Sequence, residues 1–158
     1  MKNKTLFTLL TTALAAIAIL LTILQHNYVA NATKNLAKIT INNHVVSAEL
    51  AITPQQQTKG LMGRKNLPED QGMLFVFSGE DRYAFWMKNT EIPLDMIWID
   101  SQNKVIEVKT AQPCSEETTE DVCKTYIPSA AAKYVLEVNA GWTQENEVKI
   151  GDSVTISY

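Results

Sequence analysis

The stretch FWMKNT at residues 85–90 turns abruptly from aromatic to polar. Successive side chains of a strand point to opposite faces, so Phe85 and Met87 would share one face while Trp86 and Lys88 share the other. A tryptophan beside an ammonium group suits recognition of a polar ring or an anionic group. The stretch therefore predicts a binding surface, although its last two residues equally fit a strand end that satisfies backbone groups before a turn.

Two charged residues outside this stretch extend the candidate surface. Arg64 ends the segment GLMGR, and Asp95 stands at the start of the next strand-like segment. The predicted ligand-binding set is Arg64, Trp86, Lys88, Asn89 and Asp95. Asp95 could form a buried ion pair with Arg64 or Lys88. Burying such a pair costs desolvation free energy, so buried pairs tend to have a functional role. Alternatively, Asp95 could be an ordinary surface residue.

Catalytic chemistry finds little support, and we predict no catalytic residue. The sequence contains no nucleophile elbow, zinc-protease motif or phosphate-binding glycine loop. His44 falls at an expected hairpin turn, where it would be exposed. Hydrolysis of a saccharide would need two facing acids. Glu69, Asp70 and Asp95 are conceivable members, but the sequence does not set their separation.

Metal binding is also not predicted, and no cofactor is expected. Thioethers bind Cu(I), but the four methionines of the exported part lie in apolar patterns where methionine usually fills a core. These are Met62, Met73, Met87 and Met96. The acidic stretch 115–122 could attract Ca²⁺, yet it lacks the ligand spacing of a calcium loop, so a solvated face is the better interpretation of Glu116, Glu117, Glu120 and Asp121.

The N-terminal sequence predicts export. Residues 6–24 contain only threonine and apolar side chains and follow Lys2 and Lys4, as in a signal peptide or a signal anchor. The small-residue pattern at 30–32 favours cleavage after Ala32. We expect a signal or anchor over 1–32, a linker over 33–37 and one domain over 38–158. This domain would be periplasmic or extracellular, and residues 6–24 would tether it to the inner membrane if the segment is retained as an anchor.

The charge of the expected mature chain excludes one class of partner. The first 32 residues hold two of the 14 basic side chains and none of the 17 acidic ones, so residues 33–158 carry 12 basic and 17 acidic groups, a formal charge of −5. Binding to nucleic acid needs clustered lysine and arginine, and no cluster is present. We therefore expect no nucleic-acid partner.

The two cysteines fall in the exported part. Oxidising conditions favour a disulfide between Cys114 and Cys123, whereas a zinc site is less favoured because His44 is the only histidine of the mature chain and lies far away in sequence.

The expected elements are mostly strands. Alternating residues on both sides of Asn42-Asn43 predict a hairpin, Thr53-Pro54 predicts the start of a helix over 54–62, and a second short helix is expected near 141–146. Further strands are predicted over 73–77, 82–87, 95–100, 104–112, 131–138 and 152–158. Without alternation of strands and helices, this order indicates a mainly β fold, a mostly antiparallel barrel or sandwich with one or two short helices.

Several motifs resemble the bacterial and archaeal family known as domain of unknown function 192. They are GLMGR at 60–64, LPEDQGMLFVF at 67–77, FWMKNT at 85–90, IPLDMIWID at 92–100, Pro113-Cys114 and YVLEVNAGW at 134–142. The resemblance covers residues 45–155 and implies a compact β-barrel-like domain, often exported, without an established activity. The segment between the cysteines is longer and more acidic than the family's proline-rich link.

Taken together, these observations predict an exported, non-catalytic domain that binds a small polar ligand in the cell envelope. Two alternatives stay open. The same residues would serve an envelope module that is structural or binds a protein partner, or a hydrolase or transferase acting on envelope saccharides. Co-purification of a protein partner would favour the first, and turnover of saccharides abolished by Asp95→Asn would favour the second.

Overall fold

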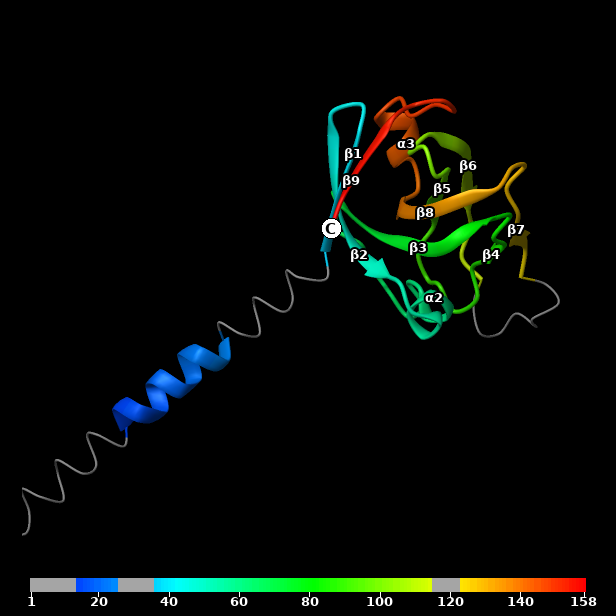
Figure 1. The fold of residues 1–158 in the computed structure, drawn as a ribbon. Helices are drawn as coiled ribbons and strands as arrows, with labels where there is room; N and C mark the ends of the chain where they lie inside the picture. Colours follow the sequence, from blue (N-terminus) through cyan, green and yellow to red (C-terminus); the bar gives the residue numbers. More distant parts are fainter. Residues whose placement is uncertain (1–13, 26–35, 115–122) are drawn as a thin grey trace, which may run out of the picture. The chain divides into compact units, whose positions relative to one another are not determined.

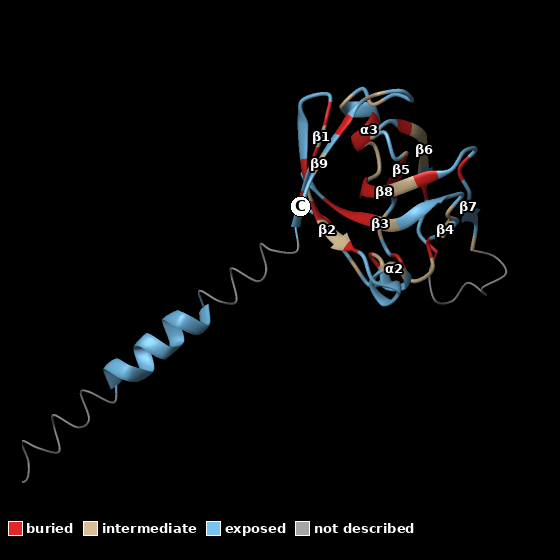
Figure 2. Cartoon of the chain, viewed as in Figure 1, coloured by how far each residue is buried: buried red, intermediate tan, exposed pale blue. Residues whose placement is uncertain are grey.

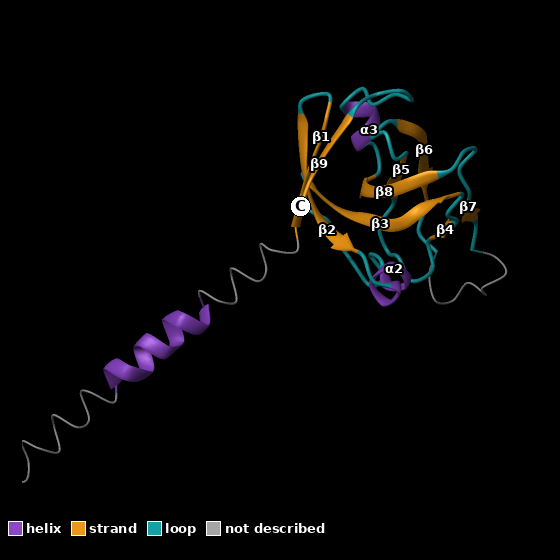
Figure 3. Cartoon of the chain, viewed as in Figure 1, coloured by secondary structure: helices purple, strands orange, loops and turns teal. Residues whose placement is uncertain are grey.

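The protein is described here by a computed structural model that covers residues 14–25, 36–114 and 123–158. The chain divides into two units, Met1–Asn35 and Leu36–Tyr158. In the first unit, residues 14–25 form an exposed helix (Figure 3). Within the described ranges, no helix combines the length and apolarity needed to cross a membrane. The beginning of the apolar segment, the cleavage site at Ala32 and most of the expected linker lie outside the described residues.

The described part of the second unit contains nine strands and two short helices. The larger sheet has seven strands in the order β6-β5-β8-β3-β2-β1-β9, and β4 pairs with β7 in a smaller sheet. The elements are β1 (Leu36–Ile41), β2 (His44–Ala51), α2 (Pro54–Lys59), β3 (Gln71–Asp81), β4 (Phe85–Trp86), β5 (Leu94–Ile99), β6 (Val105–Ala111), β7 (Thr125–Tyr126), β8 (Ala132–Asn139), α3 (Trp142–Glu145) and β9 (Val154–Ser157).

The sheet is antiparallel except where β2 runs parallel to β3. It curls into a half-barrel, with β1 and β9 at one side and β5 and β6 at the other (Figure 1). Its two edge strands approach at one end, where Lys104 bridges Ser153 and the Val105 amide donates to the carbonyl of Asp152 at 3.0 Å. The mainly β class is thus confirmed, and the architecture is a single curled sheet.

Local signals in the sequence explain several elements. Asn42 and Asn43 turn the first hairpin with φ angles of 49° and 68°, which asparagine tolerates. Thr53 and Gln56 form a capping box at the start of α2. This helix stops at Lys59, before the predicted end at residue 62, because Gly60 has a φ of 46°. In addition, β1 begins at Leu36, two residues before the predicted domain boundary.

The predicted strand over 82–87 is much shorter in the structure. Residues 78–81, which lie between the predicted strands 73–77 and 82–87, are instead part of β3, because Asp81 pairs with Ala132 after a shift of register. The chain then bends so that the Tyr83 ring stacks on Phe77 with centroids 3.5 Å apart. The Tyr83 carbonyl also accepts a hydrogen bond from Trp98 at 3.2 Å. These long-range contacts outweigh the strand pattern of residues 82–84, and only Phe85–Trp86 remain paired.

The buried residues lie mostly in the strands of the large sheet (Figure 2). Their hydrophobic side chains form two clusters, one on each face of the sheet. Leu74, Ile97 and Leu136 belong to the Trp142 cluster, named after the α3 tryptophan that packs on it. The neighbouring strand positions face the other way and form the Trp98 cluster, with Phe75, Met96 and Val135. The segment after α2 and the small sheet contribute Leu61, Met87 and Tyr126 to this second cluster, so they cover that face.

Candidate functional site

A pocket of about 360 Å³ lies on the Trp98 side of the sheet, between α2, the segment after it, β3 and β4. This volume is within the range of small-molecule sites, roughly 300–1,000 Å³. Five of the lining side chains are aromatic, and we call the site the aromatic pocket. It is lined by Pro54, Gln57, Thr58, Lys59, Gly60, Leu61, Met62, Phe75, Phe77, Tyr83, Ala84, Phe85, Trp86, Thr90 and Glu137.

The aromatic side chains hold one another in place. Phe75 meets Phe85 edge to face, with ring centroids 4.8 Å apart. Phe85 in turn lies edge-on to Trp98 at 6.0 Å, and Phe77 stacks on Tyr83. Such pairs each contribute about 0.5–1.5 kcal/mol beyond simple burial, so the wall of the pocket is preorganised.

Gly60 allows the segment after α2 to approach this wall. A Cβ atom at Gly60 would lie 3.3 Å from the end of the Phe75 ring, and its φ of 46° disfavours other residues. The first glycine of the GLMGR motif therefore shapes one side of the pocket.

Glu137 is the acidic residue of the pocket lining. It sits in the middle of β8, between Met73 of β3 and Met96 of β5, and is only 4% exposed. Among the residues that the structure describes, none donates a hydrogen bond to its carboxyl group or forms an ion pair with it. Desolvation by burial raises the pKa of Glu137 from 4.5 to about 8.

The Glu137 carboxyl opens into the pocket. No side-chain nitrogen or oxygen in the described ranges is both shut off from solvent and without a hydrogen-bond partner. The Glu137 oxygens have no such partner, so they keep contact with solvent, and the aromatic pocket that the residue lines provides that contact. The site thus combines an aromatic wall with one buried, uncompensated carboxyl group.

Three residues of the predicted site lie around this pocket or beside it. Trp86 lines it and is 41% exposed, and the Lys88 ammonium lies 5.2 Å from the Trp86 ring centroid. Phe85 and Met87 pack in the Trp98 cluster, so the predicted alternation of faces is confirmed. Asn89 has a φ of 53°, and its carbonyl accepts a hydrogen bond from the Gly63 amide at 2.7 Å. This bond joins the FWMKNT and GLMGR motifs.

Arg64 forms an ion pair with Glu49 of β2, with its Nη2 atom 2.6 and 2.7 Å from the two carboxylate oxygens. Both side chains are more than a third exposed, so the pair is a surface interaction. It lies next to Gly63 in the chain and outside the lining of the aromatic pocket.

The predicted ion pair of Asp95 with Arg64 or Lys88 is wrong, and so is the surface alternative. Asp95 is completely buried. It accepts hydrogen bonds from the Thr110 hydroxyl at 2.7 Å, the Gly141 amide at 3.1 Å, and the Thr143 amide and hydroxyl at 3.0 and 2.6 Å. Neutral donors at the start of α3 therefore satisfy the carboxylate. Because Asp95 points away from the face that holds Met96, it lies on the opposite side of the sheet from Glu137.

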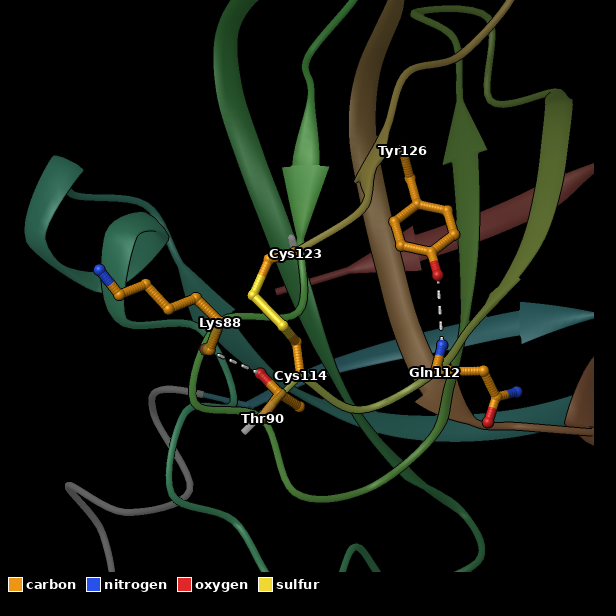
Figure 4. Close-up of a disulfide and its surroundings, with 6 residues drawn as sticks. All are labelled: Lys88, Thr90, Gln112, Cys114, Cys123 and Tyr126. Atoms are coloured by element: carbon orange, nitrogen blue, oxygen red, sulfur yellow. Dashed lines mark hydrogen bonds between the residues drawn. A yellow bond between two sulfur atoms is a disulfide. The ribbon is translucent and has the colours of Figure 1, made fainter. Parts of the chain in front are cut away.

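A disulfide holds the segment beside the pocket. Cys114 and Cys123 are joined, as predicted, with Cα atoms 5.8 Å apart (Figure 4). Cys114 also forms backbone bridges with Lys88 and Thr90, whereas the Lys88 side chain runs away from the disulfide. The chain after Cys123 continues into β7, which pairs with β4. The disulfide therefore tethers the strand that carries Trp86.

The other metal candidates find no support in the described residues. No group of three or more histidine, cysteine, aspartate or glutamate side chains is placed to hold an ion within these ranges. Met73, Met87 and Met96 are buried in the Trp98 cluster as core residues. The acidic residues at 116, 117, 120 and 121 lie outside the described part.

Sequence reasoning missed Glu137 and most of the aromatic wall. One signal was available: in YVLEVN, the acidic residue stands where β-alternation places it on the same face as Val135. A carboxyl group in a strand that is apolar on both faces is costly unless it is paired or functional. The convergence of Phe77, Tyr83 and Trp86 on it depends on the bend after β3, which has no local signature.

Comparison with protein families places the chain among uncharacterised proteins. The family model DUF192, described as Uncharacterized ACR, matches residues 37–156. UPF0127 proteins of Thermococcus kodakarensis and Thermococcus gammatolerans are each 30% identical over 112 residues, which make up 68% of this chain. These stretches cover 62% and 64% of the two relatives, so the chain spans slightly under two thirds of their length.

Two solved structures share the fold. A protein of Sinorhizobium meliloti, whose description suggests a transcription regulator, has a TM-score of 0.67 and 33% identity, covering 77% of this chain and 92% of its own. A protein of unknown function from Novosphingobium aromaticivorans has a TM-score of 0.65 and 32% identity, covering 76% and 83%.

Proposed function

We propose that this chain, which belongs to the DUF192 family of uncharacterised proteins, binds a small molecule in the aromatic pocket and does not transform it. One observation carries the proposal: a preorganised pocket of about 360 Å³ joins aromatic walls to a single buried carboxyl group, that of Glu137. Concave, mostly apolar sites with few polar groups are typical of ligand-binding proteins.

The predicted surface residues act at the edge of this site. Trp86 forms part of the wall, and Lys88 and Asn89 follow it on the same segment. In this proposal they contact polar parts of the ligand that extend beyond the wall. Arg64 supports the neighbouring GLMGR segment through Glu49, and Asp95 anchors α3.

Binding is favoured over saccharide hydrolysis by the composition of the lining. Glycosidases use two carboxyl groups that flank the scissile bond. Among the described residues that line the pocket, Glu137 is the sole acid. The buried Asp95 lies on the opposite face of β5, with its oxygens already committed to four donors.

We place this function outside the cytoplasm, because a disulfide between Cys114 and Cys123 is stable in oxidising compartments. Gene regulation, which the description of the Sinorhizobium meliloti protein suggests for that protein, is less favoured here. The formal charge of −5 on residues 33–158 opposes binding to phosphate backbones.

The proposal is tested by native mass spectrometry of the full-length chain isolated gently from its own compartment. We expect a stoichiometric extra mass in the native spectrum that disappears on denaturation. Trp86→Ala removes part of the wall and is expected to reduce the occupied fraction at least tenfold. Ile150→Ala is the matched control, since Ile150 is an exposed apolar residue outside the pocket.

Two results would contradict a small-molecule function. One is a bare native mass together with a co-purifying protein, which would favour the alternative of a partner-binding module. The other is an equal loss of bound mass in both variants, which would show that the ligand occupies another part of the chain.

A further inference from the structure

We propose that the aromatic pocket selects a ligand with a positively charged nitrogen, and that the Glu137 carboxylate receives this group. The inference rests on the proposed function of the pocket and adds the chemical class of its ligand. It is based on two observations. No described residue donates a hydrogen bond to the Glu137 carboxyl group, and aromatic rings line the same pocket.

The buried carboxyl group creates the need for a cationic partner. An ionised carboxylate in an apolar site is unstable unless it is paired or accepts hydrogen bonds. Asp95 in the same sheet shows how this protein meets that need elsewhere, with donors from Thr110, Gly141 and Thr143. Glu137 has no such donors among the described residues, yet its oxygens open into a space large enough for a ligand. An ammonium group would supply both charge and N–H donors.

The aromatic lining favours the same class of ligand. The faces of aromatic rings carry partial negative charge and attract cations within about 6 Å. Phe75, Phe85 and Trp86 belong to the lining that also contains Glu137. An anionic ligand would meet both the ring faces and the carboxyl group, so this environment disfavours it.

Other titratable groups around Glu137 are few and mostly at the edge. Lys59 of α2 and Tyr83 line the same pocket, and Lys59 is exposed. On the same face of the sheet, Glu49 is paired with Arg64, and Lys109 lies 5.8 Å from the Trp98 ring centroid. The exposed Lys59 is screened by water, so it weakens the attraction of a cation only modestly.

The proton balance of binding gives the inference a distinctive signature. When a protonated carboxyl group binds an ammonium ion, it loses one proton to the solvent and becomes the carboxylate that pairs with the ligand. Because burial raises the pKa of Glu137 to about 8, the ammonium ion competes with a proton at neutral pH. Below this pKa, affinity should therefore rise roughly tenfold for each unit by which the pH is raised.

The test is a calorimetric titration of the full-length chain with two probes that share an apolar body, phenethylamine and the neutral 2-phenylethanol. Measurements at pH 6 and pH 8 in buffers of different ionisation enthalpy report both affinity and proton release. We expect phenethylamine to bind at least tenfold more tightly at pH 8 than at pH 6, with release of a proton. The affinity of 2-phenylethanol should not change with pH.

Glu137→Gln keeps the shape of the side chain and removes its charge. We expect this variant to lose at least tenfold in affinity for phenethylamine and to bind 2-phenylethanol as before. Glu107→Gln is the matched control, because Glu107 pairs with Trp98 on the same face of the sheet but lies outside the pocket lining, and it should leave both affinities unchanged. Circular dichroism confirms that each variant is folded.

The outcomes separate the two proposals. Equal affinity for both probes, or no effect of Glu137→Gln, would overturn the cationic ligand class while leaving the pocket as a binding site. Absence of binding by either probe at millimolar concentration, with no perturbation of the Trp86 indole signal in NMR spectra, would overturn the inference and count against the proposed function as well.

Discussion

At the scale of single residues, Glu137 is a buried carboxyl group to which no described residue donates a hydrogen bond. Its carboxyl group is almost fully buried among Met73, Met96 and aromatic rings, and its raised pKa measures the cost of ionising it there. Natural cores rarely hold an unpaired acid, and perturbed titratable groups concentrate at functional sites. The residue therefore fits a binding role better than a purely structural one.

Glu137 also predicts an unusual dependence of stability on pH. The Glu137 carboxyl group has a pKa of about 8 in the folded protein, whereas its reference value, which applies to the unfolded chain, is 4.5. Between pH 4.5 and about pH 8, the folded protein therefore keeps a proton that the unfolded chain has lost. The stabilising contribution of the protonated Glu137 to the free energy of unfolding is complete below pH 4.5 and disappears as the pH rises to about 8. The free energy of unfolding should then fall by about 1.4 kcal/mol per pH unit, roughly 5 kcal/mol in total.

Urea unfolding of the wild-type protein and Glu137→Gln at several pH values measures this effect. We expect the wild-type protein to lose stability from pH 5 to pH 8 relative to the variant, which should be nearly insensitive to pH. Hydrogen bonds from Ser101, Ser129 and Lys149 lower the pKa of Glu80, Glu107 and Asp152 respectively, so these groups act only at more acidic pH. Parallel curves for the two proteins would contradict the buried state of Glu137.

At the scale of elements, the small sheet β4–β7 is held by few contacts of its own. It has only two residue pairs, Phe85 with Tyr126 and Trp86 with Thr125. Two-stranded pairs of this size are not stable alone. The disulfide and the bridges of Cys114 to Lys88 and Thr90 therefore position this sheet, and with it one wall of the aromatic pocket.

Removing the disulfide should loosen this region selectively. We expect the double variant Cys114→Ala, Cys123→Ala to lose about 2–3 kcal/mol of stability, as predicted for a short closed loop. Amide hydrogen exchange should accelerate in β4 and β7, while β1 and β2 keep their protection. Ligand affinity should fall because Trp86 is less well positioned.

A reducing agent provides the control for this experiment. It should reproduce the effect in the wild-type protein and have no effect on the double variant. Uniform acceleration of exchange across all strands would instead mean that the disulfide supports the whole fold.

At the scale of the whole molecule, both hydrophobic clusters belong to the second unit. Their described members run from Ala37 to Ile156. The approach of β6 to β9 connects the two edges of the curled sheet within the second unit. Residues 36–158 thus hold the complete core of the described fold.

This arrangement predicts that the second unit folds by itself. A chain that begins at Leu36 should match the full-length protein in its free energy of unfolding to within about 0.5 kcal/mol, as expected when no described member of either hydrophobic cluster is removed. Chemical denaturation of both chains under the same conditions measures the difference. A clear loss of stability or of the cooperative transition would show that residues before Leu36 support the fold.

The sequence by itself determined the features with local causes. Paired asparagines at 42 and 43 tolerate positive φ and turn a hairpin, and Thr53 with Gln56 caps a helix within one turn. Strand alternation correctly separated Phe85 from Trp86. The disulfide between Cys114 and Cys123 followed from their number and expected compartment. Each of these predictions depends on residues within about ten positions of one another.

Only the tertiary structure decided the features that depend on distant residues. The donors that satisfy Asp95 come from Gly141 and Thr143, 46 and 48 positions away, so its role as an anchor of α3 was not visible locally. Glu137 reaches the aromatic pocket because β8 pairs with both β3 and β5. A carboxyl group in a strand becomes buried only when the sheet packs, because only packing removes the water that would otherwise solvate its charge. Its pKa and its chemistry therefore depend on the tertiary structure.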